Sequence, residues 1–159
     1  MDPQNELVDA LQAIPWFQEL SDEHFQKICA ITHLVRVDKD TTIFAEGEQD
    51  ENLYIVLEGR VAIEIYSPVR GRIRIFTAEP LDVVGWSSVT PVVRQRTASA
   101  RAVLDSRLAA IDGLALRQLC DDDCELGYKI MRRIANVVAA RLMVTRLQLL
   151  DVFGHPEKD

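Results

Sequence analysis

The stretch "EGEQDENLYIVLEGRVAI", which runs from Glu46 to Ile63, is typical of the middle of this chain. Short segments of the same kind, rich in Val, Ile, Thr and Tyr, continue from His33 to about Ile111. Many of them alternate apolar with polar residues, as half-buried β-strands do. Glycines separate the segments at intervals of 12 to 14 residues: Gly47, Gly59, Gly71 and Gly85. This spacing predicts antiparallel strands wound into a sandwich or barrel over residues 33–112.

Helices are predicted on both sides of this β-region. Residues 1–32 place apolar side chains at three- and four-residue spacing, and Ser21 can cap a helix there. After residue 113, a short helix ends at the acidic "DDD" of residues 121–123, where an aspartate can cap a long helix that reaches about Val152. We expect a single domain over residues 1–159, with N-terminal helices (1–32), β-structure (33–112) and C-terminal helices (114–152).

The predicted long helix carries two apolar stripes. One of them suits packing on the β-structure: Leu126, Ile130, Ile134 and Val137. The other alternates four- and three-residue steps over three heptads: Met131, Ala135, Val138, Leu142, Thr145, Leu149 and Val152. Such a repeat is typical of a coiled-coil seam and favours a homodimer. The alternative is that the second stripe packs back on the N-terminal helices.

Composition narrows the class of protein. The chain has 159 residues, 48% of them hydrophobic, and a formal net charge of −7, which weighs against nucleic acid as the main partner. The basic side chains Arg132, Arg133, Arg141 and Arg146 are expected to form a solvated helix face. No apolar run is long enough for a membrane span, and no signal segment opens the chain. Three cysteines make no natural disulfide set, so we expect a cytoplasmic protein.

Residues expected for metal binding or catalysis are missing. His24, His33 and His155 are scattered and do not form a zinc pattern. No Walker loop, nucleophile elbow or dinucleotide fingerprint is present. We therefore expect neither a metal site, nor a cofactor, nor an enzyme.

The stretch from Gly85 to Ser99, "GWSSVTPVVRQRTAS", contains residues suited to holding a phosphate. A glycine allows a tight turn, and the free N–H groups of a short helical turn after it can hold an anion. Arg96 offers a planar fork that fits two phosphate oxygens, and Thr97 adds a hydroxyl. Alone, the same pattern also fits an arginine that is simply a surface charge.

The wider context resembles the cyclic-nucleotide-binding domain of the catabolite activator protein family. That family has a glycine–glutamate pair before a strand written L-Y-x-I-x-x-G-x-V, then G-D-x-x-G-E, and after a loop R-[ST]-A. The first motif is matched by Gly47, Glu48, Leu53, Tyr54, Val56, Gly59 and Val61, and the later ones by Asp82, Gly85, Arg96, Thr97 and Ala98. The resemblance implies a double-stranded β-helix or jelly roll (a β-roll) flanked by helices.

The resemblance also implies a binding site for cAMP or cGMP. Arg96 and Thr97, with Ala98, would hold the cyclic phosphate, and Gly85 with the N–H groups of Trp86, Ser87 and Ser88 would line the ribose side. Ile63 and Ile75 would form an apolar wall for the base. Thr145 would reach the base from across the dimer, although its hydroxyl can instead satisfy a carbonyl of its own helix.

Two departures from the family pattern leave alternatives open. Trp86 and Ser87 replace a Glu-Leu pair whose glutamate accepts a hydrogen bond from the ribose in the family. The domain could therefore be a ligand-free dimerisation and protein-interaction module, or could bind another anionic nucleotide such as a cyclic dinucleotide. The chain also has no room for a helix-turn-helix after the long helix, so we expect no direct DNA binding and a separate, unknown partner protein, unless the chain is a fragment of a longer regulator.

Overall fold

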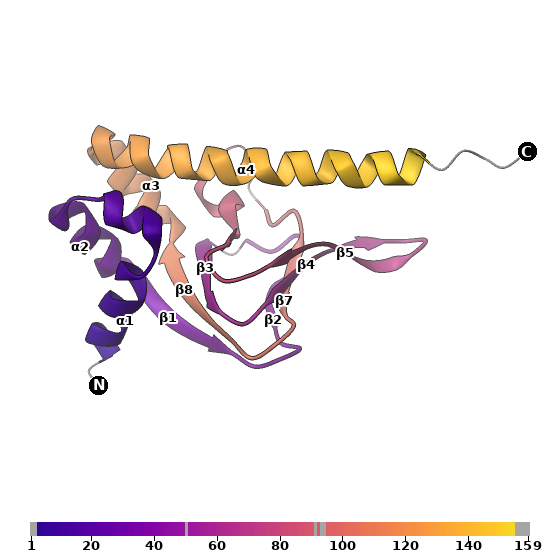
Figure 1. Ribbon diagram of the computed structural model, residues 1–159, viewed down its shortest axis with the longest axis horizontal. Helices are drawn as coiled ribbons and strands as arrows, with labels where there is room; N and C mark the ends of the chain where they lie inside the picture. Colours follow the sequence, from indigo (N-terminus) through magenta and orange to yellow (C-terminus); the bar gives the residue numbers. More distant parts are fainter. Residues whose placement is uncertain (1–2, 50, 91, 93–94, 155–159) are drawn as a thin grey trace, which may run out of the picture.

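The structure, a computed structural model, describes residues 3–49, 51–90, 92 and 95–154. It opens with three short helical elements: α1 (Pro3–Gln12), the 3-10 helix η1 (Pro15–Glu19) and α2 (Asp22–Ala30). Ser21 caps α2 as predicted, because its Oγ accepts a hydrogen bond from the backbone N–H of His24. These elements cover one end of the molecule (Figure 1).

Two antiparallel four-stranded sheets form the β-roll that the sequence predicts. The first has the order β1-β8-β3-β6 and comprises β1 (Thr32–Val37), β8 (Ser106–Asp112), β3 (Asn52–Glu58) and β6 (Val83–Val84). The second has the order β2-β7-β4-β5 and comprises β2 (Thr42–Phe44), β7 (Ser99–Ala102), β4 (Val61–Ser67) and β5 (Gly71–Ala78). The chain passes between the two sheets more than once, and one of these crossings is the tight turn between β3 and β4, which contains Gly59.

The first sheet is buried on both of its faces. In β3, Leu53 and Ile55 belong to a helix-side cluster with residues of the flanking helices, such as Phe17 and Leu126. The alternate side chains of β3 belong to an inter-sheet cluster between the two sheets: Tyr54 and Val56. Strand β8 divides in the same way, with Ala109 and Ile111 on the helix side. This double burial explains why the segment around β3 is a nearly continuous apolar run.

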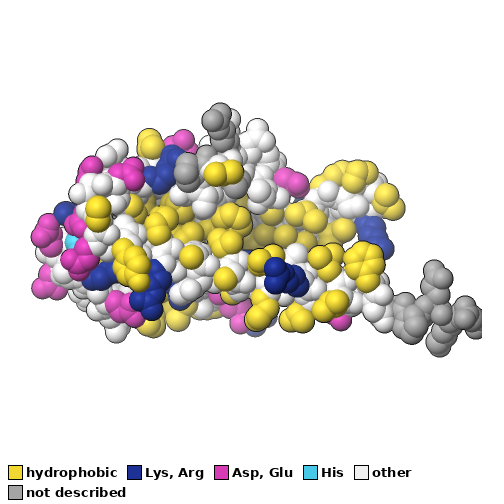
Figure 2. Space-filling model, turned by 90° about the horizontal axis from the view of Figure 1, so that it is seen from above, with side chains coloured by type: hydrophobic (Ala, Val, Ile, Leu, Met, Phe, Trp, Pro, Cys, Tyr) yellow, Lys and Arg dark blue, Asp and Glu magenta, His cyan; other side chains and the backbone are white. Residues whose placement is uncertain are grey.

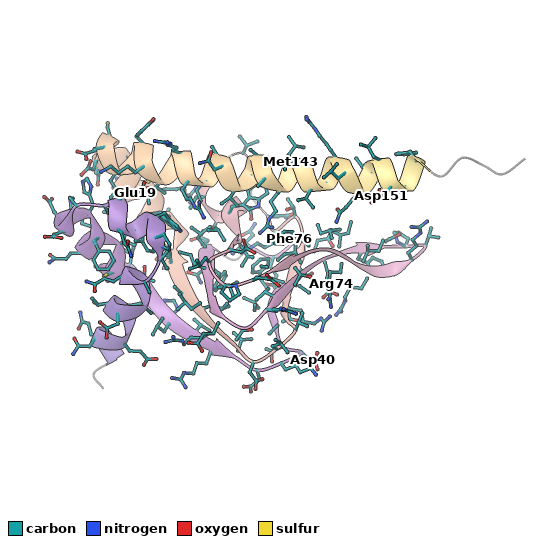
Figure 3. All side chains as sticks on the ribbon, in the orientation of Figure 1. Glu19, Asp40, Arg74, Phe76, Met143 and Asp151 are labelled. Carbon is teal, nitrogen blue, oxygen red and sulfur yellow. The ribbon has the colours of Figure 1, made fainter. Side chains whose placement is uncertain are left out.

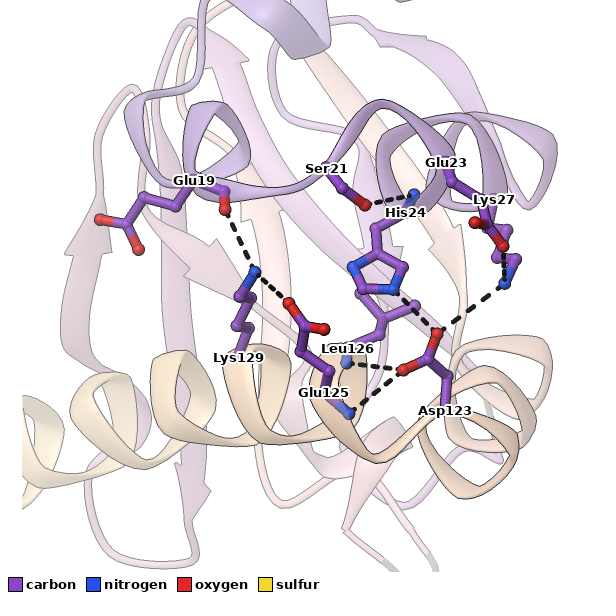
Figure 4. A network of polar contacts seen from close by, with 9 residues as sticks. All are labelled: Glu19, Ser21, Glu23, His24, Lys27, Asp123, Glu125, Leu126 and Lys129. Atoms are coloured by element: carbon purple, nitrogen blue, oxygen red, sulfur yellow. Dashed lines mark hydrogen bonds and ion pairs between the residues drawn. The ribbon is translucent and has the colours of Figure 1, made fainter.

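The C-terminal region consists of α3 (Gly113–Asp122) and the long helix α4 (Cys124–Phe153). The predicted break at the three aspartates is confirmed: Asp123 caps α4, accepting hydrogen bonds from the backbone N–H groups of Glu125 and Leu126 at 3.1 Å. The same carboxylate lies 2.8 Å from Nε2 of the buried His24 and 3.8 Å from the ammonium of Lys27 (Figure 4). The Leu126 N–H first, and then His24, lower the pKa of Asp123. This network ties α2 to the start of α4.

Helix α4 lies across the roll and extends along the side of the β4–β5 hairpin (Figure 1). The predicted core stripe is confirmed, because Leu126, Ile130 and Ile134 are buried in the helix-side cluster and Val137 packs against it. In the predicted seam, Val138 is partly buried against that cluster, whereas Leu142 and Leu149 are about half exposed in the single chain. The alternative, in which the seam packs on the N-terminal helices, therefore does not describe the distal half of the helix.

Candidate ligand-binding cavity

A left-handed turn at Gly85 begins the site. Gly85 follows β6 with φ 76° and ψ 26°, and the short 3-10 helix η2 (Trp86–Val89) comes directly after it. The backbone N–H of Ser88 donates to the Gly85 carbonyl at 3.1 Å. A Cβ atom on Gly85 would lie 2.7 Å from Nη1 of Arg96 and 3.0 Å from the Asn52 carbonyl oxygen. Glycine is required here both by the backbone conformation and by this close approach.

Arg96 is buried, with only 3% of its surface exposed, and is not a surface charge. Its Nη1 donates to the Gly85 carbonyl at 2.7 Å and to Oγ of Ser87 at 3.2 Å, and its Nη2 donates to the Asn52 carbonyl at 2.5 Å. The guanidinium also lies over the ring of Phe44, 4.1 Å from its centre. Backbone hydrogen bonds fix the residue to the β2–β3 turn, between Arg96 N and Glu48 O and between Gly47 N and Arg96 O.

The guanidinium lies in the wall of a cavity of about 170 Å³ between the roll and α4. The roll side contributes these residues: Phe44, Ile63, Ile75, Phe76, Val83, Val84, Gly85, Trp86, Ser87, Arg96, Thr97 and Ala98. Helix α4 contributes Arg141, Val144 and Thr145. Figure 2, which looks down on α4, shows a hollow with hydrophobic side chains in the middle of this face.

Most of the predicted ligand-binding residues are brought together in this lining. Ser88 is the exception among them: its Oγ donates to the Gly85 carbonyl at 3.0 Å, and its side chain lies against Gly113 at the start of α3. The hydroxyl of Ser88 therefore supports the turn from behind and does not face the cavity.

A second guanidinium, which the sequence analysis missed, also lines the cavity. Arg141 was expected on a solvated helix face, but it is partly buried, with its guanidinium 3.1 Å from the centre of the Phe76 ring. Its Nη2 donates to the Val83 carbonyl at 3.2 Å, and burial lowers the pKa of the side chain. Figure 3 shows Phe76 between α4 and the roll. The sequence could have predicted this position, because Arg141 precedes Thr145 by four residues and therefore lies on the same face of the helix.

The family model of the cyclic nucleotide-binding domain matches residues 34–123, from β1 to the start of α4. The chain belongs to the cyclic nucleotide-binding domain family.

Particular relatives agree with this assignment. The domain is 35% identical over 112 residues to a CRP-like cAMP-activated global transcriptional regulator of Mycobacterium tuberculosis, covering 70% of this chain and 47% of that one. It thus spans about half the length of this curated relative. A cyclic nucleotide-binding protein from Geobacter metallireducens has 29% identity and a TM-score of 0.71, with coverage of 89% and 98%. A cyclic nucleotide-binding domain from Methylobacillus flagellatus shares the fold, with a TM-score of 0.77, 24% identity and coverage of 93% and 83%.

Trp86 forms one wall of the cavity in this cyclic nucleotide-binding domain. The indole is partly buried and packs against the helix-side cluster, while also lining the cavity. It takes the place of the family's glutamate without filling the space beside Arg96. The cavity therefore has an aromatic surface where the family pattern has a carboxylate.

Thr145 lines the cavity from α4, but its hydroxyl donates to the Arg141 carbonyl at 2.9 Å. The hydroxyl thus bonds to a carbonyl of its own helix, which was one of the two roles expected from the sequence. The other role, a contact of Thr145 with the base across a dimer, stays a prediction. Three residues further along α4, Nε2 of Gln148 donates to the Ile75 carbonyl at 2.9 Å. Helix α4 is thus attached to β5 on both sides of Thr145, by Arg141 on Phe76 and by Gln148 on Ile75.

Other sites considered from the sequence find no support among the described residues. No group of three or more His, Cys, Asp or Glu side chains in the described ranges is placed to hold a metal ion, and His155 lies outside those ranges. All three cysteines are described and all are free thiols. Burial raises the pKa of the Cys120 thiol to about 11, which disfavours the reactive thiolate. In the part of the chain that is described, no helix could cross a membrane.

Proposed function

We propose that this chain is a regulatory domain that binds a cyclic nucleotide in the cavity beneath α4 and passes the signal through that helix to a partner protein. The observation that carries the proposal is Arg96, a buried guanidinium in the cavity wall with Ser87 and Thr97 beside the same space. A planar fork of this kind matches two phosphate oxygens. The cAMP-activated regulator of Mycobacterium tuberculosis supports the choice of cAMP as the first ligand to try.

Transmission to a partner would use the contacts of α4 with the roll. Val144 and Thr145 line the cavity, and Arg141 and Gln148 hold the helix to the second sheet and to β6. A ligand that fills the cavity would touch this helix directly. It shifts the helix only if it binds two helix arrangements with different affinity. Regulation in the cytoplasm, without catalysis by the domain itself, is part of the same proposal.

Binding is tested by calorimetry of the purified chain with cAMP and cGMP. Arg96→Gln is expected to weaken binding at least tenfold, because a hydrogen bond to a charged group contributes about 1.5–3 kcal/mol. The matched control is Arg132→Gln, on the exposed surface of α4 away from the cavity. Thermal melts of each variant separate lost binding from lost folding, since Arg96 also holds two backbone carbonyls. No heat at millimolar cAMP or cGMP, or equal affinity in Arg96→Gln, contradicts the proposal.

A second candidate function is a ligand-free interaction module, which Trp86 favours. Trp86→Glu returns the family's carboxylate to the ribose side of the cavity. If that variant binds cyclic nucleotides where the parent chain binds none, the parent is a module that has lost its ligand. If the parent already binds, this candidate is rejected.

We also propose that α4 pairs with the same helix of a second copy. Leu142, Leu149 and Val152 of the seam are 49%, 50% and 64% exposed in the single chain, and apolar residues at heptad spacing favour a paired helix. Sedimentation is expected to show a dimer for the parent and a monomer for the double variant Leu142→Glu, Leu149→Glu. Leu147→Glu changes an equally exposed leucine of α4 outside the seam and is expected to stay dimeric. A parent monomer at 100 μM, or a dimer in the double variant, opposes this pairing.

A further inference from the structure

The charges in the cavity wall are all of one sign. Among the described lining residues there are two guanidinium groups, from Arg96 and Arg141, and no carboxylate. The remaining polar groups of the lining side chains are the hydroxyls of Ser87, Thr97 and Thr145 and the indole N–H of Trp86, which are all uncharged. Such a wall attracts anions and gives nothing to neutralise a cation.

Arg141 is the unusual member of this pair. Its guanidinium is stacked on Phe76 and donates to a neutral carbonyl, that of Val83, and it forms no ion pair with any described residue. The carboxylate that acts on it electrostatically is that of Asp82, which accepts a hydrogen bond from the backbone N–H of Glu79. Withdrawing a cation from water without a counter-ion is unfavourable, and an arginine cannot escape by losing its proton. The Arg141 side chain therefore stays positively charged, and an anionic ligand group beside it would be stabilising.

The two guanidinium groups are also fixed to the same short segment. Arg96 donates to the carbonyl of Gly85 and Arg141 to that of Val83, and the Cα atoms of residues two apart are at most about 7 Å from each other. Both guanidinium groups thus border the same cavity, where Arg141 has no ion pair with a described residue. An anionic group beside Arg141 would offset the burial of its charge.

Building on the proposed function, we infer that this cavity selects a nucleotide with two separate anionic groups, one for Arg96 and one for Arg141, over a cyclic monophosphate that has only one. Three aromatic residues, Phe44, Phe76 and Trp86, belong to the same lining, and aromatic side chains suit contact with a base. Two chemical sources have the required charge: a nucleoside bisphosphate, and a cyclic dinucleotide with two bridging phosphates. The second source needs space for a second base, which the mouth of the cavity has to provide.

Calorimetry with three adenine probes tests this inference on the full chain: 3′,5′-cyclic AMP, adenosine 3′,5′-bisphosphate and cyclic di-AMP. At least one doubly anionic probe is expected to bind ten or more times more tightly than cyclic AMP, and the better of the two identifies the source. In Arg141→Gln this advantage is expected to fall below about threefold. Arg146→Gln removes an exposed arginine five residues along the same helix and is expected to keep the advantage.

The outcomes separate the inference from the proposed function. If cyclic AMP binds through Arg96 at least as tightly as both other probes, the proposed function stands and the inference is wrong. If Arg141→Gln weakens all three probes equally, Arg141 serves a single phosphate or the fold, and the inference is again wrong. If the doubly anionic probes bind through Arg141 and cyclic AMP gives no heat, the inference holds and the cyclic monophosphate is not the ligand. If none of the three probes binds, the inference is wrong; if cGMP also gives no heat, the proposed function is wrong as well.

Discussion

Replacing Gly85 by alanine is expected to abolish nucleotide binding and to lower the free energy of unfolding by about 2–5 kcal/mol. The left-handed conformation alone costs a residue with a Cβ atom about 1–2 kcal/mol. The new methyl group would also lie 2.7 Å from Nη1 of Arg96 and 3.0 Å from the Asn52 carbonyl, so the guanidinium has to leave its position. Overpacking of this kind adds about 1–3 kcal/mol. Binding is lost because the displaced group is the one proposed to meet the phosphate.

The matched control for this prediction is Gly47→Ala. Gly47 has a similar φ of +85°, but a Cβ atom there would meet nothing within 4 Å. It carries the same kind of backbone cost without the clash, so the difference between the two variants isolates the contact with Arg96. Urea unfolding measures stability and calorimetry measures binding. Full-affinity binding by Gly85→Ala would mean that Arg96 is not positioned by this turn.

Much of this fold could be predicted because each pattern has a local physical cause. The helix start at Ser21 and the break at Asp123 follow from side chains that bond to free backbone N–H groups nearby in the sequence. The strands follow from branched residues separated by glycines with positive φ, such as Gly59 and Gly71. The nearly continuous apolar sequence of β3 indicates burial on both of its faces. Which of its residues face the helices depends on the order of the strands in the sheet.

The candidate site was harder to predict, because its residues meet only through tertiary contacts. Taken by itself in the sequence, Arg141 cannot be told from an exposed helix arginine. Its position is set by Phe76 of β5, whose ring lies against the guanidinium. Ser88 looks equivalent to Ser87, yet the 3-10 turn directs one hydroxyl to Arg96 and the other to the Gly85 carbonyl. Val138 fits the heptad seam, but it is partly buried against the helix-side cluster. Apart from the bond of Ser88 to Gly85, which is three residues away, these placements depend on contacts with residues distant in the sequence.

Gly59→Ala is expected to destabilise the domain by about 3–5 kcal/mol, the largest effect on folding that we predict. Gly59 has a φ of +89°, and a Cβ atom there would lie 2.6 Å from the Asp105 carbonyl oxygen and 2.7 Å from Cα of Ser106. The cost combines a left-handed alanine, about 1–2 kcal/mol, with overpacking of about 2–3 kcal/mol, the upper part of the usual range. These obstacles are backbone atoms, so no rotamer change can make room.

The reason for such sensitivity is the place of Gly59 in the topology. Its turn carries the chain from β3 of the first sheet to β4 of the second, and the next residue, Arg60, bonds to the first residue of β8 and to the segment before it. The backbone N–H of Arg60 donates to Oγ of Ser106, and its carbonyl accepts from the backbone N–H of Val103 at 2.8 Å. Pushing the turn away would strain both sheets together. Gly71→Ala is the control, since Gly71 also has a positive φ of +73° but has nothing within 4 Å of the added methyl group. The free energy of unfolding of Gly71→Ala is expected to fall by only about 1 kcal/mol. Equal urea midpoints for Gly59→Ala and Gly71→Ala would contradict the prediction, because they would show that this turn between the sheets tolerates displacement.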